Sequence, residues 1–87
     1  MEIKYHKNFL KNYKKRIFFN PKLVDKFQKR LDIFLENSNN PVLKNHKLTG
    51  KLSIYNSFSV TGDIRVIYKI EENSILLFDI GTHNQVY

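Results

Sequence analysis

The sequence predicts a two-layer α+β domain in which a helical hairpin packs on one face of a mainly antiparallel sheet. Apolar residues recur at helical spacing through the first 36 residues, and from residue 53 they alternate with polar ones at a period of two. Turn-forming residues separate the segments, so that the elements follow in the order β-α-α-β-β-β. A chain of 87 residues is long enough for one domain, which we expect to span residues 1–87.

The first elements are a short extended segment and a helix. Residues 2–5 alternate polar and apolar side chains, and His6 reads as a surface or capping residue. The helix shows an apolar stripe of Phe9, Leu10, Tyr13, Ile17 and Phe18. Its other face carries Lys7, Lys11, Lys14 and Lys15. Because like charges at this spacing repel one another, the face indicates an anionic partner, although solvent and salt also tolerate it.

A second helix begins at Asn20 and Pro21, which suit the cap and the first helical position. It ends by the turn-forming run 37–41. Because the link between the helices is short, we expect an antiparallel hairpin. The stripe expected to be buried is Leu23, Val24, Phe27, Leu31, Phe34 and Leu35.

Three strands follow the polar connector 42–51, over residues 53–60, 64–70 and 75–80. Two tight turns join them into an antiparallel meander, and residues 81–87 form a tail. The third strand is apolar on both faces, which predicts a central place in the sheet.

The alternation within these strands separates two faces. We expect one face to pack on the helices through Ile54, Phe58, Val60, Ile64, Val66, Tyr68 and Ile70. The other face carries Ser57, Ser59, Arg65 and Lys69 and is left for solvent or a ligand.

Charge is the most uneven property of the sequence. The formal net charge is +7; residues 1–51 carry 13 basic and 4 acidic side chains (+9), and residues 52–87 carry 2 and 4 (−2). The basic half favours a polyanion, with nucleic acid the leading candidate, although a small protein also gains solubility from net charge. The absence of cysteine excludes disulfides and thiolate chemistry, and no apolar run reaches the length of a membrane span. We expect a cytoplasmic protein that does not bind membranes.

Four side chains in the second half are candidates for chemistry. His46 and His83 each lie next to a strand end, and histidine exchanges protons readily near neutral pH, although a lone loop histidine is usually a bystander. Arg65, in mid-strand, either binds a phosphate or pairs with Asp79 or Glu71. Asp63, at a turn, usually serves backbone hydrogen bonds.

These residue types are the ones that metal-free RNA cleavage needs. A base takes the proton of the 2′-hydroxyl, an acid protonates the leaving 5′-oxygen, and a cation stabilises the phosphorane. The ring of Tyr87 would stack on a base or close the core. No short paired spacing of metal ligands occurs, so we expect no metal and no cofactor.

The segments 46–51 (HKLTGK), 62–69 (GDIRVIYK) and 79–83 (DIGTH), with Tyr55 and an aromatic end, resemble the RelE/ParE toxin superfamily and are most similar to its YafQ-type branch. The resemblance extends over nearly the whole chain, although the N-terminal half matches only in pattern. It implies a toxin of a type II toxin–antitoxin system, an endoribonuclease that cleaves mRNA in the ribosomal A site. One position departs from the branch, which often has a further histidine where this chain has Ser59.

The resemblance also implies roles. His83 would be the general acid, His46 or Asp63 the base or its orienter, Arg65 the phosphate ligand, and Tyr87 the residue that positions the nucleotide. Contacts to the mRNA and rRNA backbone would come from Lys11, Lys14, Lys15, Lys44, Lys47 and Lys51.

The implied partners are mRNA, the ribosome and an acidic antitoxin that folds on the basic surface, with the free toxin a monomer. One alternative is a ParE-like toxin that inhibits DNA gyrase without cutting RNA, which would have no need of paired histidines. Another is a nucleic-acid-binding module without toxicity.

Overall fold

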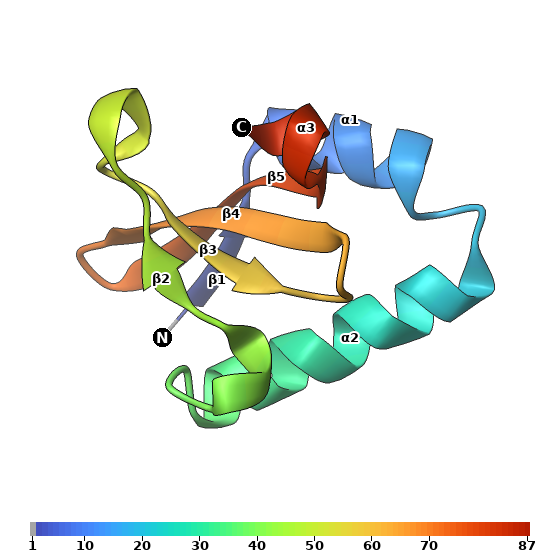
Figure 1. Ribbon diagram of the computed structural model, residues 1–87, viewed down its shortest axis with the longest axis horizontal. Helices are drawn as coiled ribbons and strands as arrows, with labels where there is room; N and C mark the ends of the chain where they lie inside the picture. Colours follow the sequence, from blue (N-terminus) through green and yellow to red (C-terminus); the bar gives the residue numbers. More distant parts are fainter. Residues whose placement is uncertain (1) are drawn as a thin grey trace.

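The computed structural model describes residues 2–87 and confirms the α+β class. A five-stranded sheet has the order β1-β5-β4-β3-β2, with β1 parallel to β5 and the other pairs antiparallel. Figure 1 shows α2 crossing below the sheet, with α1 and α3 gathered above it. The principal elements are β1 (Glu2–Tyr5), α1 (Lys7–Arg16), α2 (Pro21–Glu36), β2 (His46–Lys47), β3 (Asn56–Ser59), β4 (Ile64–Glu71), β5 (Ser74–Thr82) and α3 (His83–Val86).

Helix α1 lies along the edge of β5 beyond the point where β1 ends. Strand β1 pairs with residues 74–77 only, so the next carbonyl groups of β5 lack a strand partner. Side chains of α1 replace it, because Asn8 donates to the Phe78 carbonyl (3.4 Å) and Arg16 donates to the Ile80 carbonyl (2.9 Å). His6 caps the helix, as predicted, by accepting the Asn8 N–H at Nδ1 (3.0 Å).

This edge position corrects part of the predicted stripe of α1. Phe9 and Ile17 are buried, whereas Leu10 and Phe18 are more than half exposed. The helix turns polar residues toward the sheet, including buried Asn12, so its apolar contact is narrower than the spacing suggests.

Helix α2 supplies the layer that covers the core face. Asn20 caps it through hydrogen bonds from Lys22 and Leu23, and it ends at Asn37, as predicted. Phe34 stacks on Phe58 of β3 with ring centroids 4.7 Å apart. Leu35 is half exposed and not in the core, which is a second correction to the predicted stripes.

The segment between α2 and β3 has more structure than a polar connector. Single 3-10 turns at Pro41–Leu43 and Gly50–Leu52 flank the short strand β2. Strand β3 begins at Asn56 and not at residue 53, because the Tyr55 N–H closes a turn on the Leu52 carbonyl (2.9 Å). Ile54 is therefore outside the strand and 60% exposed, which corrects its predicted place in the core.

The meander of β3, β4 and β5 is confirmed, with two refinements. The middle strand is β4, and β5 is the interior strand between β4 and β1. Ile70, at the end of β4, is exposed and outside the core. A β-bulge at Phe78 lets both Leu77 and Ile80 face the core, because Leu77 pairs with Tyr68 while Asp79 pairs with Ile67.

Candidate active site

His83 lies at the junction where the last strand becomes a helical turn. Thr82 ends β5 and caps α3, and its N–H donates to Oε1 of Gln85 (2.8 Å) in a capping box. The rings of His83 and Tyr87, one turn apart, meet edge to face with centroids 4.3 Å apart. The imidazole is thereby held at the end of the sheet and remains exposed.

Tyr87 brings this turn onto the sheet face opposite α2. Its hydroxyl donates to Oγ of Ser57 (2.8 Å), a fully buried serine in the middle of β3. The ring is 40% exposed and outside the hydrophobic core, so of the two predicted roles only stacking against a ligand stays open. The face predicted to be free is therefore covered in part by the chain's own C-terminal residues.

In the part of the chain that the structure describes, Arg65 forms no cross-strand ion pair. Asp79 accepts instead from Asn12 (2.7 Å) and Arg16 (3.4 Å), and the carboxylate of Glu71 lies 4.0 Å from Lys69. Nη1 of Arg65 is buried and has no hydrogen-bond partner among residues 2–87. A buried guanidinium N–H without a partner is costly. The rest of the Arg65 side chain is only partly buried and can pair with an anion.

The neighbour of Arg65 on β5 is Gly81, and two long side chains pack closely over it. A Cβ at Gly81 would lie 2.7 Å from Nη1 of Arg16 and 2.7 Å from Oε1 of Gln85. The close approach of these two side chains joins the end of β5 to both α1 and α3.

Asp63 lies in the turn between β3 and β4, across a cavity from His83. The turn is closed by the Thr61 hydroxyl, which accepts from the N–H groups of Asp63 (3.2 Å) and Ile64 (3.0 Å), so the Asp63 carboxylate makes neither bond. The cavity has a volume of about 370 Å³ and is lined by Gly62, Asp63, Arg65, Thr82, His83 and Asn84. Three predicted catalytic residues therefore line one cavity.

His46 does not line this cavity. It lies exposed on β2, at the position paired with Ser57, the residue that Tyr87 contacts. Its Nδ1 is 2.9 Å from the Lys44 carbonyl oxygen. A carbonyl can only accept, so Nδ1 carries a proton, and in the neutral ring Nε2 has a lone pair.

Ser59 is buried on β3 and pairs with Arg65 of β4. Its hydroxyl donates to the Thr61 carbonyl (2.6 Å). Its proton is engaged in the turn, so this serine does not replace an exposed acid or base.

The lysines predicted to bind RNA are all exposed. Lys11, Lys14 and Lys15 lie on α1, and Lys44, Lys47 and Lys51 lie between α2 and β3. Lys44 adopts a left-handed conformation (φ 47°) at the end of the first 3-10 turn.

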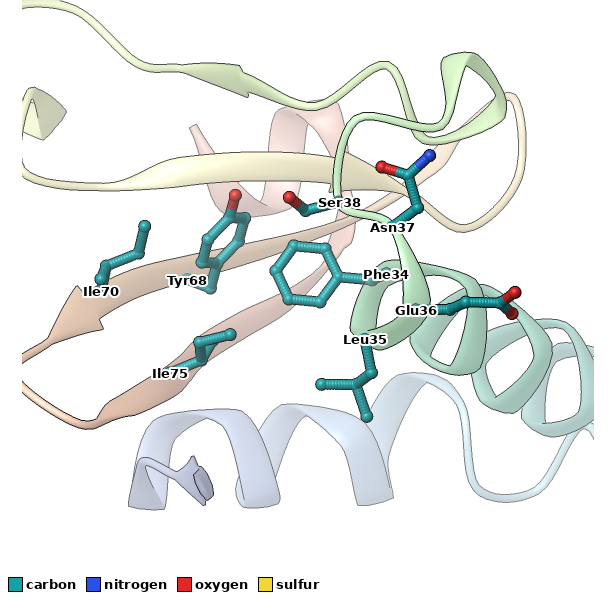
Figure 2. A pocket seen from close by; sticks show the side chains of 8 residues that line it. All are labelled: Phe34, Leu35, Glu36, Asn37, Ser38, Tyr68, Ile70 and Ile75. Atoms are coloured by element: carbon teal, nitrogen blue, oxygen red, sulfur yellow. The ribbon is translucent and has the colours of Figure 1, made fainter. Parts of the chain in front are cut away.

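A larger cavity, of about 600 Å³, lies at the C-terminal end of α2. Figure 2 shows Phe34, Leu35, Ile70 and Ile75 around it, with the Tyr68 ring among them. Burial raises the pKa of the Tyr68 hydroxyl, although a hydrogen bond to Asn45 (2.7 Å) opposes the shift. None of the predicted site residues lines this cavity.

Within residues 2–87, no three His, Cys, Asp or Glu side chains group as metal ligands. In the same part of the chain, no helix is long and apolar enough to cross a membrane.

Sequence reasoning missed two residues and one contact of this region. Thr82 and Asn84 line the cavity, and Ser57, which was placed on this face, accepts a hydrogen bond from Tyr87. The spacing of Thr82 and Gln85 is a capping-box signal, which could have replaced the predicted tail with a helical turn. The contact of Ser57 with Tyr87 joins residues 30 positions apart, and no local pattern encodes it.

Comparison with known proteins identifies one family. A family model described as the bacterial toxin YafQ of type II toxin–antitoxin systems matches residues 1–87. No curated protein sequence gives a significant match.

Solved structures share the fold. YafQ from E. coli strain BL21(DE3) is 22% identical with a TM-score of 0.80, covering 99% of this chain and 97% of its own. A YoeB/ParE toxin from Agrobacterium tumefaciens is 15% identical with a TM-score of 0.80 (95% and 99%). A chain of the E. coli DinJ–YafQ toxin–antitoxin complex is 23% identical with a TM-score of 0.76 (99% and 96%).

Proposed function

The chain belongs to the family of bacterial YafQ toxins of type II toxin–antitoxin systems, and we propose that it is a metal-independent endoribonuclease that cleaves mRNA in the ribosomal A site to inhibit translation. The toxin class follows from the family, while the cleavage and the residue roles are the proposal.

One observation carries it. The guanidinium of Arg65 has a buried nitrogen without a partner, and Arg65 lines a cavity together with Asp63 and His83. A phosphate in that cavity would accept from Arg65 while an acid and a base stand within the same lining. That combination supports phosphoryl chemistry better than binding alone.

The proposed step is attack of a 2′-oxygen on the adjacent phosphorus. The new 2′-O–P bond forms as the P–O5′ bond breaks, which leaves a 2′,3′-cyclic phosphate and a free 5′-hydroxyl. His83 gives its proton to the 5′-oxygen, and Arg65 balances the charge of the phosphorane.

The base that takes the 2′-proton is Asp63 or His46. Asp63 lines the cavity, whereas His46 lies outside it, with its free Nε2 available to a strand that crosses from β2 to the cavity. Tyr87 positions the nucleotide through its ring, and the exposed lysines bind the mRNA and rRNA backbone.

The proposed protein partner is an acidic antitoxin. YafQ of E. coli forms a toxin–antitoxin complex with DinJ, and this chain has a basic surface that a segment of opposite charge would cover. We propose that the free chain is a monomer and that it acts in the cytoplasm, where mRNA is translated.

The test is His83→Ala, measured by growth arrest on induction and by cleavage of mRNA on programmed ribosomes. We expect cleavage to fall by about a hundredfold or more, since a positioned acid contributes at least that much. The far-UV circular dichroism spectrum should be unchanged, because the ring is exposed. Undiminished cleavage would remove His83 from the mechanism.

The rival target is DNA gyrase, because the shared fold does not discriminate between the two activities. A supercoiling assay run beside the cleavage assay separates them: inhibition of gyrase without RNA cleavage would replace the proposal. Ser59→His tests the one departure from the branch, and increased cleavage would show that the serine limits activity.

A further inference from the structure

We propose that the chain has a second nucleotide-binding subsite, formed by Phe78, Tyr55 and His6 with Lys7 and Lys11, which binds a base and phosphate of the RNA outside the catalytic cavity. The inference rests on the proposed function and adds a binding site to it.

The subsite begins with three aromatic rings from three parts of the chain. The ring of Phe78 lies 4.8 Å, centroid to centroid, from Tyr55 and 4.8 Å from His6. None of the three belongs to the hydrophobic core, and all are partly exposed. Such a cluster presents a stacking surface for a planar ligand.

The β-bulge accounts for the position of Phe78. Phe78 has no partner in β4, since Leu77 and Asp79 take the neighbouring register positions. Leu77 and Ile80 then face the core, and Phe78 packs on Tyr55 and His6 outside it. Bulges of this kind redirect a side chain.

The surroundings of the rings are cationic. A cavity of about 530 Å³ is lined by His6, Lys7, Asn8, Lys11 and Phe78, and this lining contains no carboxylate. Lys7 and Lys11 lie one helical turn apart on the exposed face of α1. Nδ1 of His6 accepts the Asn8 N–H, so its Nε2 carries the proton and can donate to a phosphate or base edge.

This surface lies on the same strand as the catalytic cavity. Phe78 is four residues before Thr82, a separation of about 13 Å at the ordinary rise of a strand. An extended RNA of a few nucleotides can bridge that distance along β5. Aromatic stacking next to a cationic surface is the combination that binds single strands without sequence preference.

The experiment measures how RNA length changes affinity. Fluorescence anisotropy with His83→Ala protein, which should not cut, compares oligouridines of three to nine nucleotides extended at either end. We expect the longer strands to bind more tightly than the shortest by about fivefold to a hundredfold, the range for stacking one base. Adding Phe78→Leu should remove most of that gain, because leucine keeps the packing but lacks a stacking face.

The matched control is Phe19→Leu, which changes an aromatic residue that is 78% exposed at the α1–α2 link, away from the cavity. It should keep the full length gain. Lys7→Gln with Lys11→Gln should flatten the salt dependence of binding, whereas Lys22→Gln with Lys26→Gln on α2 should not. Equal melting temperatures of the Phe78→Leu and parent proteins would exclude a folding effect.

The outcomes separate this inference from the proposed function. If the Phe78→Leu protein still binds longer RNA more tightly, as the parent does, the subsite is overturned, even where cleavage is intact. The subsite is also overturned if Phe78→Leu weakens only the binding of an acidic peptide, because that result assigns the surface to a protein partner. If the wild-type chain neither binds nor cleaves RNA, the proposed function and the subsite both fail.

Discussion

The two faces of the β3-β4-β5 meander have opposite properties. On the face toward α2, Phe58 and Val66 are fully buried among apolar side chains. On the other face, Arg65 keeps a buried nitrogen without a partner, and Ser57 is covered by Tyr87 from the end of the chain. Side chains are buried on both faces, but only the face toward α2 is packed with apolar side chains. The difference teaches that stability and chemistry can be changed separately in this fold.

The largest effect is expected from breaking the apolar face. Phe58→Ala removes a fully buried ring that stacks on Phe34, at a cost of about 3–5 kcal/mol. Urea unfolding measures the loss, with Phe19→Ala as the control because that ring is mostly exposed. A loss below 1 kcal/mol would contradict the assignment of Phe58 to the core.

The second largest effect is expected on RNA cleavage, when the Arg65 cation is removed from the other face. Arg65→Met should lower RNA cleavage by about a hundredfold to a thousandfold, as does loss of other preorganised groups that stabilise transition-state charge. Stability should be unchanged or higher, since a buried donor without a partner is removed. Lys69→Met, four residues along the same strand, is the control. Equal losses of activity in both variants would refute a specific role for Arg65.

Asp79 is a buried polar residue outside the core, and we expect it to contribute to stability and not to cleavage. Its Oδ1 accepts from Asn12 and from the Ile80 N–H, with Arg16 3.4 Å away. Asp79→Ala leaves these donors without an acceptor and should cost about 2–3 kcal/mol of stability. Cleavage per folded molecule should fall less than tenfold. A larger fall at full stability would place Asp79 in the catalytic machinery.

The smallest expected effect is a change of stability with pH, and it concerns Tyr68 on the apolar face. Burial raises the pKa of Tyr68, so the folded state favours the neutral hydroxyl more than the unfolded state does. The stability that this contributes is complete below the ordinary tyrosine pKa of about 10 and is lost as pH rises above it.

Tyr68→Phe should therefore cost about 1 kcal/mol at pH 7, where the bond to Asn45 is lost. Its deficit relative to wild type should shrink above pH 10. Chemical unfolding at pH 7 and pH 11 measures both values, and a deficit that stays constant would contradict the burial of this hydroxyl.

Local sequence patterns were sufficient for most of the fold. The cap at Asn20, the end of α2 at Asn37 and the meander are as predicted because helical spacing, turn residues and alternation act over a few neighbours. The errors in the predicted core have two causes. Leu10 lies inside α1, whose apolar contact with the sheet is narrower than the spacing suggests, whereas Leu35 lies at the end of α2 and Ile54 lies before β3 begins.

The sequence by itself determined the fold class, the concentration of charge in residues 1–51 and the residue types of the candidate site. Only the tertiary structure decided that Arg65 has no carboxylate partner among residues 2–87, because Asp79 pairs with Arg16 across 63 residues. It also decided that Asp63 and His83 line one cavity while His46 stands outside it. Periodicity reports which way a side chain points relative to its neighbours in the chain, whereas these contacts depend on which elements meet.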